Sequence, residues 1–166
     1  MTTRAAALAA LLVIGAGLAG PSAARQDPTE VIDVGNRIPA HPPMGAEGRA
    51  ALERLRRNGG ITLQWISWDY RGRLAVSDRG GRVHLSGGQR QRGGPGRLEL
   101  DGDVTEMSER SFTFRGRIAI TDTPDPGRNC LRDSAYEFRI TGRRRYWRLQ
   151  QMEQCDGLTD YVDIYF

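Results

Sequence analysis

Apolar and polar residues alternate along most of the chain after residue 60. The clearest segment is 112–120, whose even-numbered positions carry Phe112, Phe114, Ile118 and Ile120. Side chains of a β-strand point alternately to its two faces, so a period of two is typical of a strand that is buried on one face. The segment 112–120 is therefore predicted to be a strand with its aromatic and aliphatic side chains in the core.

A second alternating segment, 98–104, precedes this strand and predicts its antiparallel partner. If Asp101 lies opposite Arg115 and Glu99 lies opposite Arg117, an acidic row meets a basic row on the polar face. Each such exposed pair would contribute about 0.2–1 kcal/mol. We predict this register for the two strands.

Two cysteines lie symmetrically about a Gly142-Arg143 turn, with arms over 130–140 and 145–155. A two-residue loop with glycine first suits a type II′ turn. Opposite residues of an antiparallel pair have a constant sum of residue numbers, so this register places Phe138 opposite Trp147 and Cys130 opposite Cys155. In an oxidising compartment Cys130 and Cys155 are expected to form a disulfide.

Four further strands are predicted over 61–69, 73–77, 82–86 and 161–166. The second and third of these would form a hairpin with Arg79-Gly80 as its two-residue loop. That hairpin places Val76 opposite Val83, and it makes His84 a solvent-facing residue on the other side of the strand.

One short helix is predicted over 46–57, because Ala51, Leu52 and Leu55 share a face and Asn58-Gly59-Gly60 would end it. With the eight strands, this gives an all-β fold. An antiparallel meander of eight strands can close into a small barrel of lipocalin-like architecture, which removes the sheet edges. The N-terminal helix would cover one end.

The N-terminus has a charged start, an apolar run and small residues before position 25. This pattern predicts a signal peptide over 1–24, followed by a Pro-rich tether over 25–45 and the folded domain over 46–166. A periplasmic or secreted location follows. The Gly15-to-Gly20 stretch also fits the dinucleotide motif G-x-G-x-x-G, but Pro21 and the lack of β-α alternation exclude the required context.

All 24 basic side chains are Arg, and the formal net charge is only +4, which does not favour nucleic-acid binding. The predicted meander gathers arginines at the helix end and carboxylates at the loop end. Peripheral contact of the basic end with an anionic membrane surface is one expectation, and a simple solvated charge distribution is the other. No catalytic set, metal site or cofactor motif is recognised, so enzymatic activity is not predicted.

A short helix before a Trp-bearing first strand resembles the plan of calycins, although the Gly-x-Trp signature of lipocalins is missing. The segments 63–68 (LQWISW), 146–150 (YWRLQ) and 161–166 (YVDIYF) resemble a family of small exported bacterial proteins of unknown function. This second resemblance implies no activity and no site residues.

The long connections of the meander would share one rim, where loops on a rigid scaffold commonly bind ligands. A small molecule bound at the rim or in the interior is the first expectation, and a periplasmic interaction or inhibitor module that uses the rim loops is the alternative. An outer-membrane barrel is disfavoured because the strands are too short to span. Candidate rim contacts are Arg90, Arg92 and Arg128. Candidate interior lining or core residues are Trp65, Phe112, Phe114, Phe138 and Trp147.

Overall fold

The computed structural model describes residues 44–79 and 81–166. The predicted signal peptide and all of the tether except residues 44 and 45 lie outside the described residues. Within the described part, no helix is both long enough and apolar enough to cross a membrane.

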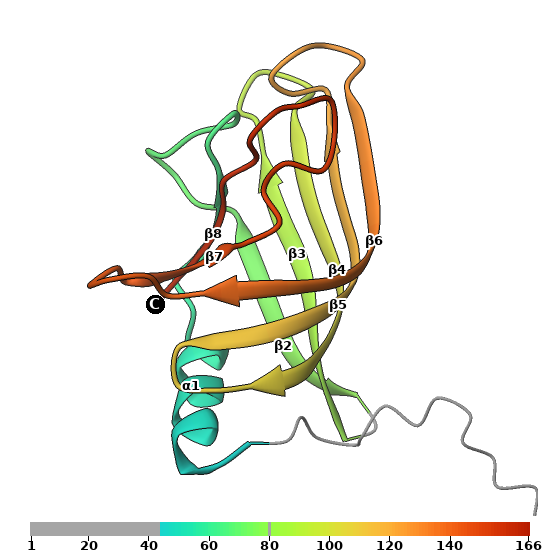
Figure 1. Ribbon diagram of the computed structural model, residues 1–166. Helices are drawn as coiled ribbons and strands as arrows, with labels where there is room; N and C mark the ends of the chain where they lie inside the picture. The colour runs from blue at the N-terminus through green and yellow to red at the C-terminus, as the bar shows by residue number, and fades with distance from the viewer. Residues whose placement is uncertain (1–43, 80) are drawn as a thin grey trace, which may run out of the picture. The chain divides into compact units, whose positions relative to one another are not determined.

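The described residues form one helix and eight strands (Figure 1). Their bounds are α1 (Ala46–Arg56), β1 (Gly60–Leu63), β2 (Arg73–Arg79), β3 (Arg82–Arg90), β4 (Arg97–Met107), β5 (Ser111–Thr121), β6 (Asn129–Arg139), β7 (Tyr146–Leu149) and β8 (Val162–Tyr165). The strands pair in the order β1-β8-β7-β6-β5-β4-β3-β2, and every pair is antiparallel. Between β1 and β2 there is only an isolated bridge, Ile61 to Gly72. The predicted meander is confirmed, as a nearly closed barrel.

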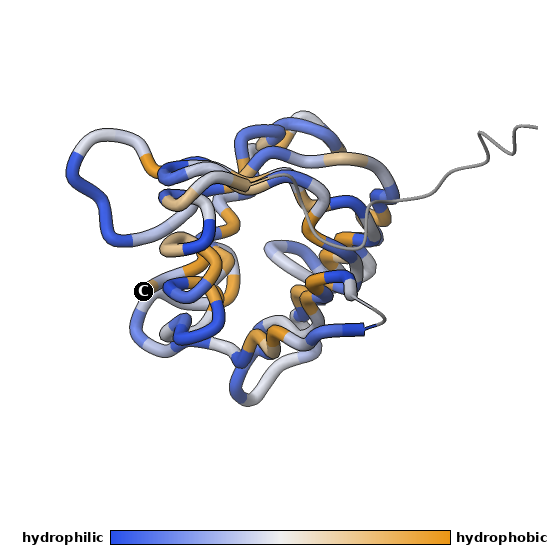
Figure 2. Tube along the Cα trace, turned by 90° about the horizontal axis from the view of Figure 1, so that it is seen from below, coloured by the Kyte–Doolittle hydropathy of each residue, from blue (hydrophilic) through white to orange (hydrophobic). Residues whose placement is uncertain are grey.

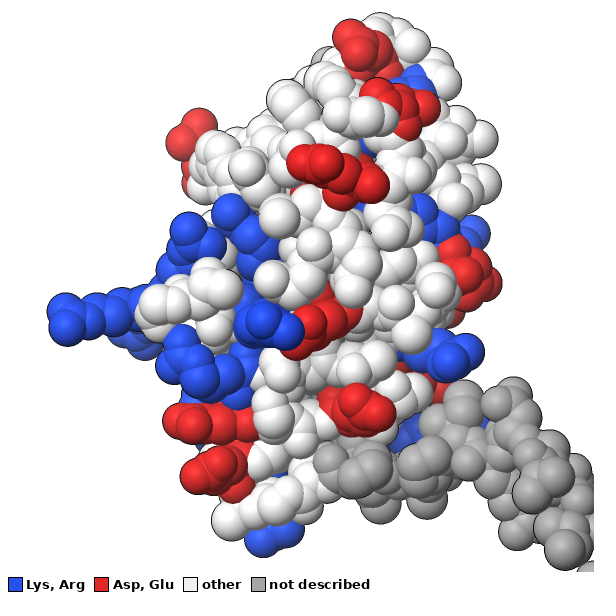
Figure 3. All heavy atoms as spheres, in the orientation of Figure 1, with Lys and Arg blue, Asp and Glu red and all other residues white. Residues whose placement is uncertain are grey.

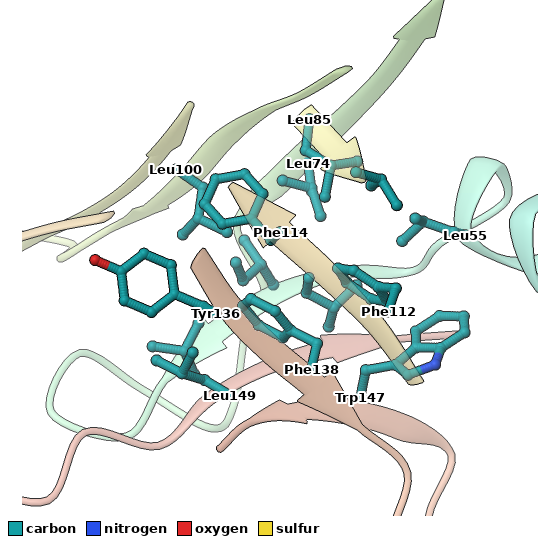
Figure 4. Packing of buried hydrophobic residues seen from close by; sticks show 14 of the residues in the cluster. Leu55, Leu74, Leu85, Leu100, Phe112, Phe114, Tyr136, Phe138, Trp147 and Leu149 are labelled. Atoms are coloured by element: carbon teal, nitrogen blue, oxygen red, sulfur yellow. The ribbon is translucent and has the colours of Figure 1, made fainter. Parts of the chain in front are cut away.

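Large apolar side chains fill the barrel. Viewed from the helix end, the chain traces a ring (Figure 2), and the inward side chains meet inside that ring (Figure 4). The rings of Phe112 and Phe138 stack with their centroids 5.0 Å apart, and Trp147 meets Phe112 edge-on at 5.8 Å. Phe114 completes the cluster by packing edge-on against Phe138. The alternation of β5 is thus explained by burial of one face.

The helix covers one end of the barrel, as predicted (Figure 1). Ala51, Leu52 and Leu55 are its buried apolar residues. At Gly48 an added Cβ would lie 2.8 Å from the carbonyl oxygen of Met107, so only glycine permits this close approach of α1 to the end of β4.

The predicted hairpin registers are wrong by two residues in each case, although the faces are right. Val76 pairs with Leu85, not Val83, because the ladder ends with Arg79 opposite Arg82, one position later than predicted. Asp101 pairs with Arg117, not Arg115; here a bulge interrupts the β4–β5 ladder after Val104. A shift of two residues leaves each side chain on the same face.

The hairpin of β6 and β7 shows the same error. Phe138 pairs with Leu149, because the turn spans residues 140–145 rather than two residues. The backbone N–H of Ile140 donates to the carbonyl of Arg110 in the neighbouring turn, which ends the β6–β7 ladder early. The disulfide between Cys130 and Cys155 is nevertheless present.

Strand β1 is also shorter than the predicted 61–69. The side chain of Gln89 accepts a hydrogen bond from the backbone N–H of Leu63 at 2.7 Å. After Leu63 the N–H groups of Ile66 and Ser67 donate back to its carbonyl, which forms a turn. The residues beyond Leu63 therefore belong to a loop at the end of the barrel opposite α1.

Candidate functional site

Four loops gather at the end of the barrel opposite α1 and form a rim (Figure 1). They are residues 64–72, 91–96, 122–128 and 150–161. Hydrogen bonds tie the first loop to the third and fourth. Trp65 Nε1 donates to Asp160 at 3.1 Å, and Thr123 Oγ1 donates to the carbonyl of Trp65 at 3.0 Å. The amide of Gln64 accepts from the N–H of Tyr161 at 2.7 Å. The rim is therefore a connected surface rather than a set of independent loops.

Three exposed residues of this rim, Trp68, Arg90 and Arg92, lie with the half-buried Tyr70 in what we name the rim patch. Trp68 is 49% exposed. The hydroxyl of Tyr70 accepts from the N–H of Arg92 at 2.9 Å and donates to the carbonyl of Arg90 at 3.2 Å. The guanidinium carbon of Arg92 lies 4.0 Å from the centroid of the Tyr70 ring. These contacts order Tyr70 and Arg92 before any partner arrives.

The side chain of Gln89 holds the backbone of the rim patch in place. Its side-chain amide donates to the carbonyls of Ser67 and Tyr70, at 3.0 and 2.8 Å, and it is almost fully buried. One side chain therefore fixes both the end of β1 and the backbone on which Trp68 and Tyr70 stand.

Arg128 lies at the loop end but is buried, so it does not present its guanidinium to a partner. Its Nη1 and Nη2 donate to the two oxygens of Asp160 at 2.9 and 3.0 Å, and Nη1 also donates to the carbonyl of Thr123. Asp156 accepts from Nε at 3.2 Å. Burial acts to lower the pKa of Arg128, but the hydrogen bonds and charge of Asp160, with those of Asp156, raise it overall. Arg128 thus differs from Arg90 and Arg92, whose side chains are exposed.

The structure separates the predicted site residues into three groups. Arg90 and Arg92 lie together on the rim patch. Trp65 is partly buried beneath the rim. Phe112, Phe114, Phe138 and Trp147 are buried in the core, and a role for them in lining a ligand cavity stays a prediction. A hollow of about 520 Å³ beside Glu106, Ser111 and Glu137 opens on the outer surface.

The outer face of β7 and β8 carries a row of stacked aromatic and guanidinium groups that sequence reasoning missed. We name Arg71, Tyr165, Tyr146, Arg148 and Tyr161 the aromatic ladder. Arg71 lies 3.9 Å from the Tyr165 centroid, and the Tyr165 and Tyr146 centroids are 5.2 Å apart. Arg148 lies 5.2 Å from Tyr146 and 4.2 Å from Tyr161. The signal was present in the segments 146–150 and 161–166, where Arg148 and Asp163 each lie two positions from a tyrosine and so on the same strand face.

A buried carboxylate anchors this ladder. Asp163 accepts two hydrogen bonds from Arg148, both at 2.7 Å, in bidentate geometry. The hydrogen bonds and charge of Asp163 raise the pKa of Arg148, although burial acts to lower it. The ladder therefore keeps its central cation paired within the protein.

Basic side chains gather beside the ladder, over the turn between β6 and β7 (Figure 3). Arg143, Arg144 and Arg145 are exposed there. The guanidinium of Arg144 lies 5.7 Å from the ring of Tyr146, which joins this basic turn to the ladder. Contact of the basic turn with an anionic membrane surface stays a prediction.

His84 is buried, so the expectation of a solvent-facing residue is wrong. It lies on the outer face of β3 between two carboxylates of β4. Its Nδ1 is 2.7 Å from Asp103 Oδ1 and its Nε2 is 3.5 Å from Asp101 Oδ2. Within the part of the chain that the structure describes, no three His, Cys, Asp or Glu side chains are arranged to hold a metal ion.

The sequence profile of the PM1083 family matches residues 44–166, which include α1 and all eight strands. The chain belongs to the PM1083 family. A relative from Pasteurella multocida (strain Pm70), named "Uncharacterized protein PM1083", is 41% identical over 108 residues, which cover 64% of this chain and 69% of that protein. No solved structure matches the chain. The resemblance to a family of uncharacterised proteins is confirmed, whereas the resemblance to calycins is not.

Proposed function

We propose that the protein is an exported binding module that holds a partner protein of the cell envelope on its rim patch. The observation that carries this proposal is an exposed Trp68 two residues from Tyr70, whose ring is already stacked with Arg92. Tryptophan, tyrosine and arginine are the residues most enriched at energetic hot spots of protein interfaces. Side chains that are already ordered lose little conformational entropy on binding.

The packed interior favours a protein partner over a small molecule held inside the barrel. Trp147, Tyr136, Phe112, Phe114 and Phe138 are the largest fully buried side chains, and they pack on one another along the inner face of the adjacent strands β5, β6 and β7. A lipocalin-like ligand would have to displace these rings. Binding on the rim requires no such displacement.

The chemistry of the rim patch indicates what the partner offers. Arg92 stacks on Tyr70, which leaves the edge of its guanidinium available to an acceptor, and Arg90 is exposed beside it. The expected partner surface therefore combines an apolar pocket for Trp68 with a carboxylate near Arg92. Insertion of the rim loops into the cleft of an envelope enzyme would make the protein an inhibitor.

Export is supported by the pattern of residues 1–24 and by the disulfide, because disulfides persist in oxidising compartments. Fractionation of cells that produce the full chain tests this part of the proposal. Recovery of a shortened protein in the periplasm or medium would support it. A full-length protein in the cytoplasm with free thiols would contradict it.

The binding proposal is tested by crosslinking the full chain in envelope fractions and comparing Trp68→Ala with Leu131→Ala. Leu131 is the matched control, since it is 59% exposed but lies on β6 away from the rim patch. Trp68→Ala and Arg92→Ala should lose the crosslinked partner, and with the purified partner each should raise Kd by about 30-fold, the weight of a 2 kcal/mol hot spot. Equal loss with Leu131→Ala, or no loss with Trp68→Ala, would overturn the proposal.

A further inference from the structure

The basic turn lies at the helix end of the barrel, because β6 runs from the rim toward that end and β7 runs back from it. Its three consecutive arginines, Arg143, Arg144 and Arg145, are all exposed. Basic side chains project from the side of the molecule at this turn (Figure 3). The turn therefore presents three guanidinium groups to solvent within one short segment.

Contacts connect two further arginines to the basic turn. Arg110, in the turn between β4 and β5, donates to the carbonyl of Gly142 at 2.7 Å. The backbone N–H of Phe166 donates to the carbonyl of Arg145 at 3.3 Å. The guanidinium carbon of Arg54, from α1, lies 4.9 Å from the centroid of the Phe166 ring. Residues from the helix and from two turns therefore meet at this part of the surface.

The aromatic ladder extends the same surface across β8. Arg144 lies 5.7 Å from the centroid of the Tyr146 ring, and the Tyr146 and Tyr165 centroids are 5.2 Å apart. Arg71 lies 3.9 Å from the Tyr165 centroid. Both tyrosines are half-buried. Six arginines are thus connected through these contacts, and we name them the basic patch: Arg54, Arg71, Arg110, Arg143, Arg144 and Arg145.

The protein does not neutralise the charge of the basic patch. Within residues 44–79 and 81–166, none of its six arginines forms an ion pair. The carboxylate of Glu53, next to Arg54 in α1, pairs with Arg56 instead. Glu109, next to Arg110, is exposed and offsets only one of the six cations. A large positive excess is therefore available to an external anion.

The arrangement of the patch favours an extended anionic surface over a single small anion. Its arginines come from α1, two turns and the loop before β2, so they are spread over the surface rather than gathered around one point. Tyrosine, with an apolar ring and a polar hydroxyl, is enriched at the level of lipid headgroups. Clustered arginines are attracted to anionic headgroups. This combination is typical of a membrane-surface contact.

We propose that the basic patch docks the protein on an anionic phospholipid surface. Each arginine close to such a surface strengthens binding by about fivefold, so the three arginines of the basic turn together contribute about 100-fold. The apolar part of the patch is small and half-buried, so the attraction is mainly electrostatic and depends on salt.

This docking surface is independent of the rim patch. The rim loops and the basic turn lie at opposite ends of strands β6 and β7. A molecule that rests on a membrane through the basic turn therefore keeps Trp68 and Arg92 free for a partner protein. Trp68→Ala should leave membrane binding unchanged, so the two proposals can fail separately.

The test is cosedimentation of the full chain with two kinds of vesicle, one of equal parts phosphatidylglycerol and phosphatidylcholine and one of phosphatidylcholine alone. The apolar run over residues 5–20 would bind both kinds, so the quantity compared is the ratio of the two partition coefficients. The combined substitutions Arg143→Gln, Arg144→Gln and Arg145→Gln should lower this ratio by about 100-fold. Raising the salt from about 0.01 M to about 1 M, which shortens the Debye length from about 30 Å to about 3 Å, should bring the wild-type ratio close to one.

The matched control is the combination of Arg97→Gln, Arg115→Gln and Arg117→Gln. These three arginines are also exposed, but they lie on β4 and β5 and are not part of the basic patch. The control variant has the same net charge as the variant of the basic turn, so it separates the patch from the charge of the whole molecule. Its ratio should stay near that of the wild type.

A second measurement locates the docked surface without any substitution. Paramagnetic headgroups in the phosphatidylglycerol vesicles should broaden the backbone amide resonances of residues 141–146 more than those of residues 68–70 on the rim. Equal broadening of the two segments would overturn the proposal. So would a turn variant that keeps the wild-type ratio, a control variant that loses as much as the turn variant, or binding to single-stranded DNA but not to vesicles.

Discussion

Removal of the disulfide with the double substitution Cys130→Ala and Cys155→Ala should destabilise the protein by a calculable amount. The bridged residues are separated by 25 positions. In the chain-entropy model a loop of this length restricts the unfolded chain by about 3.5 kcal/mol at 25 °C. For a folded unit of about 120 residues, with an unfolding entropy near 2.1 cal/mol/K per residue, the midpoint should fall by about 14 °C.

The structure also indicates which segments should open first when the disulfide is removed. Cys130 lies in β6, where it pairs with Ile120 of β5, and Cys155 lies in the rim loop 150–161. Without the bridge, that loop is held by individual hydrogen bonds such as Asp160 N–H to the Met152 carbonyl at 2.9 Å. Local opening should therefore become easier in the loop than in the sheet.

Calorimetry gives the change in midpoint, and hydrogen exchange of oxidised and substituted protein gives its location. Amides of 121–133 and 153–160 should gain exchange before those in the middle of β4 and β5. Unchanged exchange in these two segments would refute the assignment of the disulfide as a brace of the rim. A midpoint that falls by only one or two degrees would refute the entropy calculation.

Three further results are expected. Arg128→Met leaves Asp160 buried without its main partner and should lower the free energy of unfolding, measured in urea, by about 3–5 kcal/mol. Adding Asp160→Leu should recover part of this loss. A double variant less stable than Arg128→Met would contradict the prediction. Asn58→Ala removes side-chain hydrogen bonds to the carbonyls of Leu55 and Leu74 and to the N–H of Gly60. The free energy of unfolding should fall by about 1–3 kcal/mol with an unchanged m-value. An unchanged free energy of unfolding would show that water replaces the amide. Burial raises the pKa of Tyr136, so its contribution to stability is complete below the unfolded tyrosine pKa and is lost as pH rises through the higher folded value. Stability curves of the wild type and Tyr136→Phe should therefore diverge only above about pH 10, and parallel curves there would contradict the prediction.

The faces of the strands could be predicted from the sequence, but their registers could not. Alternation assigns Phe112 and Phe138 to the core whatever their partners are, because the face of a strand residue depends only on parity. Partner choice depends on the turns, whose conformations reflect contacts with other elements. The bond from Ile140 to Arg110 is such a contact, since it joins two turns that lie far apart in the sequence. The Cys130–Cys155 pairing was predicted correctly from a register that is itself wrong.

The candidate site could be predicted only in outline. The long loops do share one rim, and Arg90 and Arg92 do lie there. The burial of Arg128 could not be foreseen, because its partner Asp160 lies 32 residues away in another loop. Trp68 falls within the predicted strand 61–69, since nothing local reveals that the Gln89 side chain ends β1 at Leu63.

The pairing of β1 with β8 determines when the barrel can be completed. Gly60 lies opposite Tyr165, so β1 cannot pair until β8 is available. About 100 residues of intervening chain must be ordered before this pair forms. Strands β2 to β6 can assemble hairpin by hairpin as the chain emerges from a ribosome or a translocation pore. During that interval β1 presents an unpaired edge, open to other nascent chains. The segment YVDIYF, which contains β8, therefore completes the barrel by pairing with β1. A chain truncated before this segment would leave the edge of β1 unpaired and prone to association.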